Sequence, residues 1–200
     1  PVVAVVSAFA GDTDARLQNA ARTSPPLSPF AIAAHVGLGE YESAALLLQA
    51  LDAHGLPAAT LDPAAIGLVA SGPPLDASPQ DVSTRRLRLL LRRHGTVVVP
   101  GFVAIDTDGN RVLLSRGGSD LTALFLARRL GARCRLLKDV NGLFDRDPNQ
   151  DPAARRYHGA SFATALATDG SIVQHRAVAF AQQHRMQFEL GALADELPTQ

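Results

Sequence analysis

Apolar residues in this chain form several unbroken runs, which predict strands buried on both faces. Such runs occur at Val2–Val6 and at residues 96–105, and a further strand is expected at residues 133–137. A shorter return run at residues 111–114 follows Thr107–Asn110, a Thr-Asp-Gly-Asn sequence typical of a hairpin turn. A last strand is expected at residues 187–190. Because runs without polar alternation are characteristic of parallel strands, the pattern predicts a mostly parallel sheet.

Helices are predicted where apolar residues recur every three or four positions. One helical stretch is expected over residues 30–55, interrupted between Gly37 and Gly39 and stopped by Gly55. Another begins after the candidate N-cap Ser83 and ends at Gly95. Three more helices are expected: an almost wholly apolar one that follows residues 116–120, one at residues 160–167 and one at residues 172–184.

Alternation of strands and helices predicts an α/β fold, a three-layer sandwich of helices around a mostly parallel sheet. Two hundred residues suit a single domain. Residues 68–80, rich in Gly, Pro and Asp, are interpreted as a long turn-rich connection. Ligands of such sheets bind beyond the carboxyl ends of the strands. Three polar loops are expected at such ends: Ser7–Asp14, the segment from Gly101 onward, and Lys138–Pro148.

The charge balance argues against a nucleic-acid-binding protein. The chain has 19 basic and 19 acidic residues, for a formal net charge of zero, whereas nucleic-acid binders usually carry a basic excess. Five arginines fall in the helix expected over residues 83–95, and we interpret them as the solvated face of an amphipathic helix. They are Arg85, Arg86, Arg88, Arg92 and Arg93.

The cysteine, histidine and hydropathy patterns restrict which kinds of site the protein can contain and where in the cell it is expected. Cys134 is the single cysteine, which excludes an internal disulfide framework and a cysteine-rich zinc site. The six histidines show no metal-ligand spacing, so no metal site is predicted among the side chains. No apolar run is long enough to span a membrane, and no signal-peptide pattern is present. A cytoplasmic protein without nucleic-acid or membrane partners is therefore expected.

The stretch Arg116–Asp120, Arg-Gly-Gly-Ser-Asp, has two interpretations. Glycine amides at a helix N-terminus can bind an anion, and an arginine beside them can hold a carboxylate or phosphate. Alternatively, the glycines form a tight turn, while Ser119 caps the helix and Asp120 occupies its favoured first turn. The spacing alone leaves both open. No Walker A pattern occurs, which excludes a P-loop fold.

A second candidate binding site is the loop that starts at Lys138, the only lysine of the chain. An ammonium group is a compact point charge, unlike the wide guanidinium fork of arginine. The loop could wrap a nucleotide, with Lys138 near phosphates and Phe144 against the base or ribose. An ordinary turn rich in Asp, Asn and Gly explains the same residues.

Taken in order, these segments resemble the amino acid kinase family, and within it the aspartate kinases. The carrying motifs are VVSAFAGDTD, GEYESAALL, VVVPGF, SRGGSDLTA and KDVNGLFDRDP. Together they cover essentially the whole chain. The later motifs most resemble aspartate-kinase-like domains linked to homoserine dehydrogenases, although the dehydrogenase fingerprint G-x-G-x-x-G is absent.

The resemblance implies an ATP-dependent enzyme, with Mg²⁺, that phosphorylates the side-chain carboxylate of L-aspartate. It implies that Glu40 holds the ammonium group of the amino acid and Arg116 its α-carboxylate, with Asp120 and Lys138 as catalytic residues. The remaining implied amino acid and phosphoryl contacts are Ser7, Thr13, Gly117, Gly118 and Ser119. The implied nucleotide contacts are Lys138, Asp139, Phe144, Asp147, Pro148 and Arg176.

Two lysines of the family pattern have no counterpart here. The first belongs to a Lys-Phe-Gly-Gly-Thr-Ser motif on the family's first strand, and the chain begins after that point. The second is expected near residues 171–178, where Arg176 is the nearest cation. A missing preorganised charge costs on the order of several kcal/mol in a phosphoryl-transfer site, so these residues alone are expected to turn over poorly.

A second hypothesis therefore remains beside the kinase. The chain could be a non-catalytic domain of kinase ancestry that binds an amino acid or nucleotide and scaffolds a homoserine dehydrogenase-type partner. A homo-oligomer is also compatible with the sequence. The matched charges of Glu40, Arg116 and Asp120 favour the kinase, while the missing lysines favour the scaffold.

Overall fold

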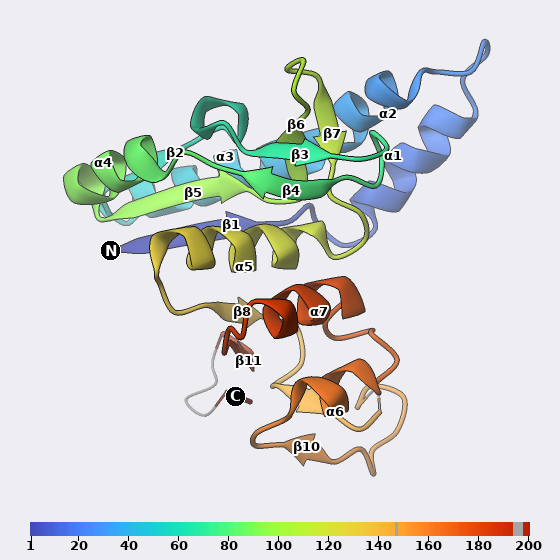
Figure 1. The fold of residues 1–200 in the computed structure, drawn as a ribbon, viewed down its shortest axis with the longest axis vertical. Helices are drawn as coiled ribbons and strands as arrows, with labels where there is room; N and C mark the ends of the chain where they lie inside the picture. The colour runs from blue at the N-terminus through green and yellow to red at the C-terminus, as the bar shows by residue number, and fades with distance from the viewer. Residues whose placement is uncertain (147, 194–197) are drawn as a thin grey trace. The chain divides into compact units, whose positions relative to one another are not determined.

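The computed structural model describes residues 1–146, 148–193 and 198–200. The chain divides into two compact units, Pro1–Thr122 and Ala123–Gln200 (Figure 1). The single domain predicted from the length stays a prediction.

The centre of the first unit is a parallel three-stranded sheet. Its order is β1 (Val2–Val6), β5 (Thr96–Pro100) and β2 (Ala58–Thr60), with Val2 opposite Thr96. Val97, Val98 and Val99 are all fully buried. Since successive side chains of a strand point to opposite faces, β5 is covered on both, as its unbroken apolar run predicts.

A second sheet in the same unit has the order β4 (Ser78–Asp81), β3 (Val69–Ser71), β6 (Val103–Ile105) and β7 (Arg111–Leu113). The predicted hairpin joins β6 to β7, and Asp106 accepts hydrogen bonds from the amides of Asp108 and Asn110 in its turn. The predicted single strand at 96–105 is wrong, because it breaks at Gly101–Phe102 into β5 and β6.

The turn-rich connection expected at residues 68–80 is also wrong in part, since it contains β3 and β4. Both strands are short and include or border turn-forming residues such as Gly72 and Pro79. Their pairing comes from outside the segment, because β3 hydrogen-bonds to β6, which lies far along the chain. A pattern confined to residues 68–80 does not contain that information.

Helices of the first unit follow the glycine and serine signals closely. α2 (Pro29–Val36) is capped by Ser28, whose hydroxyl accepts from the amide of Ala31. α3 (Leu38–Ala53) starts after Gly37, where a Cβ would lie 2.9 Å from Val103 Cγ2, so the predicted interruption reflects close packing. α4 (Thr84–His94) ends at Gly95, but Ser83 makes no side-chain cap hydrogen bond.

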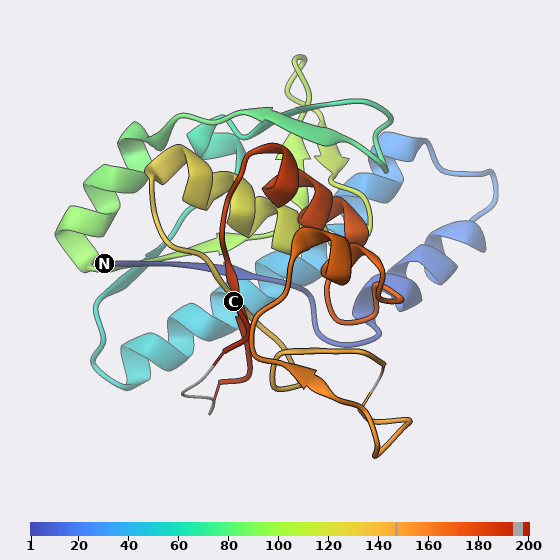
Figure 2. The ribbon, with the colours of Figure 1, turned by 60° about the horizontal axis from the view of Figure 1, so that its bottom comes forward.

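The helix α1 (Asp12–Ala21) is absent from the sequence prediction. It begins inside the loop expected at Ser7–Asp14, directly after Gly11, whose φ of 81° ends the turn. Its residues are mostly polar or small, and only Ala20 is buried. It lies beside α2 in both ribbon views (Figures 1 and 2). Packing against α2, rather than its own periodicity, supports this helix.

The second unit contains the larger part of α5 (Gly118–Leu130) and two strand pairs. β8 (Arg135–Leu137) pairs in parallel with β11 (Glu189–Gly191), and β9 (Leu143–Phe144) pairs antiparallel with β10 (Arg156–Tyr157). α6 (Phe162–Leu166) and α7 (His175–Gln183) are shorter than the predicted helices. The core includes Leu124, Cys134, Leu136, Val178 and Leu190.

The predicted fold class is confirmed. Four of the seven strand pairings among the described residues are parallel, and helices alternate with the strands. None of the described helices combines the length and apolar character needed to cross a bilayer.

Candidate functional site

Two of the three predicted strand-end loops meet in the first unit. β1 and β5 are parallel neighbours, so the loops that follow them leave the same edge of the sheet (Figure 1). The amide of Gly101 donates to the carbonyl of Val6 at 2.8 Å, directly before Ser7. Ser7 is exposed and Thr13 is half-buried in the first turn of α1.

Glu40, in the first turn of α3, lies against the loop after β1. Its side chain is 2% exposed, and Oε1 accepts from the amide of Ala8 at 3.3 Å. Oε2 is buried and has no hydrogen-bond partner among the residues that the structure describes. A buried carboxylate oxygen without a donor is costly. Glu40 therefore has the capacity to accept from a bound donor such as an ammonium group.

Burial raises the pKa of Glu40 to about 7, and the nearby negative charge of Asp12 acts in the same direction. The hydrogen bond from Ala8 and the positive charge of Arg16 oppose the shift without cancelling it. Glu40 thus changes its charge near neutral pH.

Asp12 packs against the start of α3. A Cβ on Gly39 would lie 2.2 Å from Asp12 Oδ2 and 2.7 Å from Ala8 Cβ. Arg16 holds this carboxylate with a 2.7 Å ion pair and also reaches Glu42 at 3.3 Å. The glycine before Glu40 is needed so that α1 and α3 can approach. Sequence analysis did not identify Asp12 or Arg16 as part of this cluster.

Arg116 is the exposed cation of the same region. Its side chain is 88% exposed, and Nη2 lies 3.9 Å from Asp14 Oδ1, at the limit of an ion pair. Such a pair contributes little to stability. The contact nevertheless joins the turn before α5 to the first turn of α1, which carries Thr13.

Ser119 adjoins the loop after β5. A Cβ on Gly101 would lie 2.7 Å from Ser119 Oγ and 2.8 Å from the carbonyl oxygen of Val6. The three segments therefore meet with no room for a side chain on Gly101. Ser119 and Asp120 are both half-buried at the start of α5.

The two glycines of the Arg-Gly-Gly-Ser-Asp stretch have structural reasons of their own. Gly117 has a φ of 75°, which disfavours other residues, and a Cβ on Gly118 would lie 2.5 Å from Phe102 Cδ2. The tight turn accounts for both. The ligand interpretation of this stretch therefore rests on Arg116, whose guanidinium reaches solvent and, within the described part of the chain, has the long contact to Asp14 as its one ion pair.

Thr122 was not predicted as important but joins two parts of the site. Its hydroxyl donates to the carbonyl of Gly118 at 2.8 Å and accepts from the amide of Phe102 at 3.2 Å. Phe102 has a φ of 61°, which is unfavourable for a non-glycine residue. The fully buried threonine holds this turn against the first turn of α5.

The first unit thus brings Ser7, Thr13, Glu40, Arg116 and Ser119 into one region from three segments that are distant in sequence. A buried anion with a vacant acceptor and an exposed cation match the two charges of a free α-amino acid. These are the two kinds of charge that a site for a free α-amino acid would need, and the roles assigned to these residues stay predictions.

The predicted nucleotide residues lie in the second unit. Lys138 follows the carboxyl end of β8, where its amide donates to the carbonyl of Gly191 at 2.9 Å. Asp139 is exposed, Phe144 is half-buried in β9, and Pro148 is half-buried. Arg176 is half-buried in the first turn of α7. Asp147 lies outside the described residues. The roles assigned to this set stay predictions.

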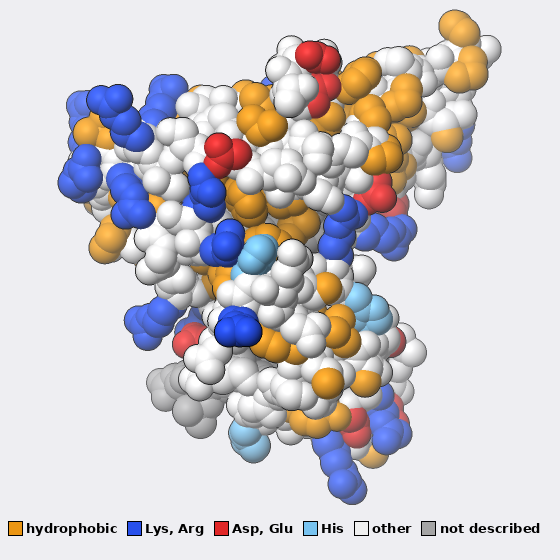
Figure 3. Space-filling view, in the orientation of Figure 1, with side chains coloured by type: hydrophobic (Ala, Val, Ile, Leu, Met, Phe, Trp, Pro, Cys, Tyr) orange, Lys and Arg blue, Asp and Glu red, His pale blue; other side chains and the backbone are white. Residues whose placement is uncertain are grey.

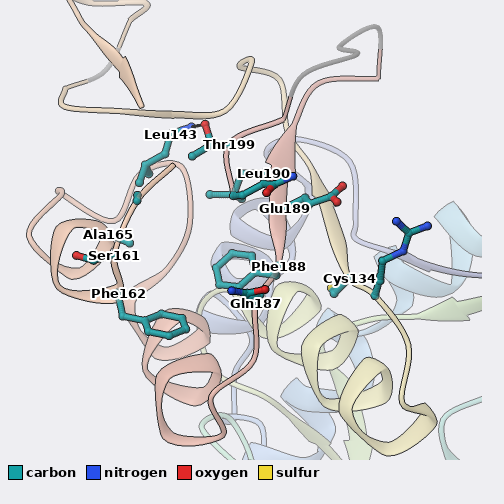
Figure 4. A pocket seen from close by; sticks show the side chains of 13 residues that line it. Cys134, Leu143, Ser161, Phe162, Ala165, Gln187, Phe188, Glu189, Leu190 and Thr199 are labelled. Carbon is teal, nitrogen blue, oxygen red and sulfur yellow. Dashed lines mark hydrogen bonds between the residues drawn. The ribbon is translucent and has the colours of Figure 1, made fainter. Parts of the chain in front are cut away.

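A cavity of about 460 Å³ also lies in the second unit (Figure 4). Its lining includes Cys134 before β8, Phe188 before β11, and Phe162 of α6. It therefore opens near the amino ends of the β8–β11 pair, whereas Lys138 follows the carboxyl end. Of the predicted nucleotide residues that the structure describes, none is among its lining side chains.

Within residues 1–146, 148–193 and 198–200, no group of three or more His, Cys, Asp or Glu side chains could hold a metal ion. This finding bears on sites built by protein ligands alone. A magnesium ion that arrives with a nucleotide usually takes most of its ligands from phosphates and water.

Comparison with known proteins identifies the family of this chain. A model of the amino acid kinase family matches residues 1–188. The aspartokinase of Pseudomonas aeruginosa is 34% identical over 189 residues, which covers 92% of this chain and 46% of that protein. The Helicobacter pylori aspartokinase is 34% identical over 166 residues, or 82% of this chain and 41% of that protein. The chain spans less than half the length of these curated relatives.

Solved structures agree with the sequence comparison. Synechocystis aspartate kinase superimposes with a TM-score of 0.81 at 30% identity, over 98% of this chain and 33% of that chain. E. coli aspartokinase III, solved in complex with aspartate and ADP, gives a TM-score of 0.75 at 26% identity, over 90% of this chain and 41% of that chain. The fold, the order of the motifs and a family match that reaches from residue 1 to residue 188 together show that the chain belongs to the amino acid kinase family.

Proposed function

We propose that this chain acts in an aspartate kinase that transfers the γ-phosphoryl group of ATP to the side-chain carboxylate of L-aspartate, giving 4-phospho-aspartate. The observation that carries the proposal is the pairing of Glu40, buried with a vacant carboxylate oxygen, and Arg116, an exposed guanidinium on the adjoining loops. The similarity to aspartokinases, one of them solved with aspartate and ADP, supports the choice of substrate.

In this proposal Glu40 accepts the ammonium group of aspartate and Arg116 holds its α-carboxylate. Ser7 and Thr13 border the same loops and complete the amino acid contacts. The side-chain carboxylate is then directed toward Ser119 and the start of α5. Because the protein makes no covalent bond, its contribution is alignment of two anions and neutralisation of charge.

The bond changes balance without an enzyme nucleophile. A side-chain oxygen of aspartate bonds to the γ-phosphorus as the bond to the β,γ-bridging oxygen breaks, which leaves ADP. Backbone amides of Gly117 and Gly118 are proposed to face the phosphoryl region, with Asp120 orienting charged groups around it. Lys138 is proposed to lie near the phosphates, with Asp139, Phe144, Asp147, Pro148 and Arg176 as the other nucleotide contacts.

Mg²⁺ bound with ATP would neutralise part of the phosphate charge. It fits the residues present, because Mg²⁺ needs only one or two carboxylates beside phosphates and water, and Asp120 is a half-buried carboxylate at the start of α5. We place the reaction in the cytoplasm. A homo-oligomer and a joined or associated homoserine dehydrogenase belong to the proposal as partners.

One observation favours a second candidate function. Residues 171–178, where the family resemblance implies a phosphate-binding lysine, contain no lysine, and Arg176 is the nearest cation. A domain that binds aspartate and nucleotide without turnover, and supports a partner enzyme, would need fewer cations around the phosphates.

The two candidates are separated by measuring binding and turnover on the full-length protein. Aspartate-dependent ADP release with ATP and Mg²⁺, together with a hydroxamate formed when hydroxylamine traps the acyl phosphate, is the expected result. Arg116→Ala should raise the KM for aspartate at least about tenfold through loss of a charge-assisted hydrogen bond. Arg22→Ala, another exposed arginine of the first unit, is the matched control.

Aspartate binding without ADP release would support the non-catalytic domain. Absence of both aspartate binding and aspartate-dependent ADP release would contradict both candidates.

A further inference from the structure

The helix α4 carries a strongly basic outer face. Its sequence, Thr84–His94, contains five arginines and no acidic residue. All five arginines are exposed. Its inner side packs on the β5–β2 part of the sheet, with Leu87 fully buried. In the space-filling view, Lys and Arg side chains gather over this helix (Figure 3).

Leu89 is the exception among the leucines of α4. It is 57% exposed, and two residues separate it from Leu87 by about 200° around the helix, hence on the opposite side. Four arginines surround it at helical spacing, since residues three and four apart share one face. They are Arg85, Arg86, Arg92 and Arg93. We refer to Leu89 and these four arginines as the α4 patch.

The arginines of the α4 patch have no carboxylate partner within the part of the chain that the structure describes. Arg88, between them, hydrogen-bonds to Thr84 Oγ1. The chain as a whole has a net charge of zero. Its balancing carboxylates therefore lie elsewhere, and charge is segregated onto this helix.

Folding does not require this arrangement. Cations stabilise the last turn of a helix, which accounts for Arg92 and Arg93, but they oppose the helix dipole in the first turn, where Arg85 and Arg86 lie. Arg88 lies three residues after Arg85 and four residues before Arg92, so like charges also repel along this side of the helix. An exposed leucine at the centre adds apolar surface to water. Local stability thus argues against the α4 patch rather than for it.

We propose that the α4 patch binds an acidic segment of a partner protein, one with an apolar side chain placed among its carboxylates. The arginines would pair with the carboxylates, and Leu89 would cover the apolar side chain. Complementary charge of this kind directs association and sets its orientation. Shielding of the charges by the partner would relieve the repulsion along α4.

The same observations disfavour other partners. A membrane-bound helix needs a broad apolar face, whereas in α4 Leu87 is buried, Leu90 and Leu91 are half-buried, and Leu89 alone is an exposed leucine. Single-stranded nucleic acid is usually bound with aromatic stacking, and α4 has no aromatic residue. A protein segment fits both the charges and the leucine.

The test uses the full-length protein and a labelled synthetic peptide of 15 residues. The peptide has a central leucine with two glutamates one turn before it and two one turn after it, and binding is followed by fluorescence anisotropy. Between 50 and 300 mM NaCl, we expect the affinity to fall about tenfold, since salt screens exposed charges. A peptide with glutamine in place of each glutamate should bind at least about tenfold more weakly.

Variants locate the binding site on the protein. Arg85→Gln combined with Arg92→Gln should weaken peptide binding at least about tenfold, and Leu89→Ser should weaken it about threefold. Arg22→Gln combined with Arg155→Gln removes the same charge from exposed positions elsewhere and should change binding less than about twofold. Because the substituted side chains are exposed, the variants are expected to fold, which circular dichroism checks.

Three results would overturn the proposal. One is equal binding of the glutamate and glutamine peptides, or equal loss in the control variant. Another is tighter binding of a 20-nucleotide RNA or of phosphatidylserine vesicles through the same arginines. The third is concentration-dependent self-association in sedimentation velocity that the α4 variants abolish, which would make a second copy the partner.

Discussion

Single residues decide the charge that the candidate amino acid site presents. Glu40 is a carboxylate placed where water is excluded, and burial raises its pKa to about 7. Its Oε2 has no partner, and neither has the buried hydroxyl of Ser43 one turn later in α3. The free-energy cost of the two groups differs, because burying an unpaired carboxylate costs far more than burying an unpaired hydroxyl.

The affinity for aspartate is predicted to depend on pH through Glu40. An ammonium group is attracted by the ionised carboxylate only, so binding should strengthen as pH rises from 6 to 8 across the pKa of about 7. Isothermal titration calorimetry of aspartate at pH 6, 7 and 8 measures this. A flat profile over that interval would show that Glu40 does not hold the ammonium group.

Glu40→Gln is predicted to stabilise the protein while it impairs the site. Below pH 4.5 the carboxyl is protonated in both the folded and unfolded states. Between pH 4.5 and 7 only the unfolded state releases the proton, so stability is lost as pH rises through this interval. Glutamine removes that loss, and at pH 8 the free energy of unfolding should increase on the order of 2 kcal/mol. Aspartate affinity should fall at least about tenfold.

Urea denaturation at pH 4 and pH 8 checks the stability effect, which should be present at pH 8 and nearly absent at pH 4. A variant that is less stable than the parent at pH 8 would show that Glu40 is already stabilised in its ionised form.

At the scale of elements, the site depends on how the ends of strands and helices are joined. Thr122 connects the turn after β5 to the first turn of α5, and Gly101 lets the loops after β1 and β5 meet at Ser119. Sequence patterns located most of these elements, including β1, β5, the break between α2 and α3, and the β6–β7 hairpin. They missed α1, β3 and β4, whose support comes from distant partners rather than from their own periodicity.

Thr122→Val is predicted to lower the free energy of unfolding by about 1 to 3 kcal/mol, because the amide of Phe102 and the carbonyl of Gly118 lose their shared partner. Urea denaturation with an unchanged m-value measures it. Ser43→Ala is the matched control, since the Ser43 hydroxyl has no partner to lose, and it should change stability by less than about 0.5 kcal/mol. Equal losses in the two variants would contradict the role given to Thr122.

Gly101→Ala is predicted to disturb the site more than its small size suggests. The added methyl would lie 2.7 Å from Ser119 Oγ and 2.8 Å from the carbonyl oxygen of Val6, so one of the loops must shift. The KM for aspartate should rise about tenfold or more, as displaced site residues often cost that much. Gly159→Ala serves as the control, because its Cβ would meet only an ordinary contact at 3.5 Å. An unchanged KM for aspartate in Gly101→Ala would show that Ser119 is not part of the aspartate site.

On the scale of the whole molecule, the residues proposed to bind the amino acid lie in one compact unit, and those proposed to bind the nucleotide lie in the other. The chain spans less than half of its curated aspartokinase relatives. Charge is distributed unevenly as well, with a basic α4 in a chain whose formal net charge is zero.

Substitutions in one unit are therefore predicted to weaken binding of one ligand and leave the affinity for the other nearly unchanged. Lys138→Met should weaken ADP binding about tenfold, through loss of a charged partner for phosphate, and leave aspartate binding within about twofold. Arg116→Ala should do the reverse. Calorimetric titration of each variant with each ligand tests this. A loss of ADP affinity in Arg116→Ala equal to that in Lys138→Met would contradict the assignment.

The sequence by itself determined the fold class, the strands with unbroken apolar runs, the helix ends marked by glycine, and the family resemblance, because each depends on local order along the chain. The tertiary structure decided which of the polar residues work together. Burial of Glu40, the approach of Arg116 to Asp14 and the double hydrogen bond of Thr122 arise between segments far apart in sequence. Exclusion of water from a carboxylate depends on all the groups packed around it. Those groups come from distant segments of the chain, so the local sequence pattern does not identify them.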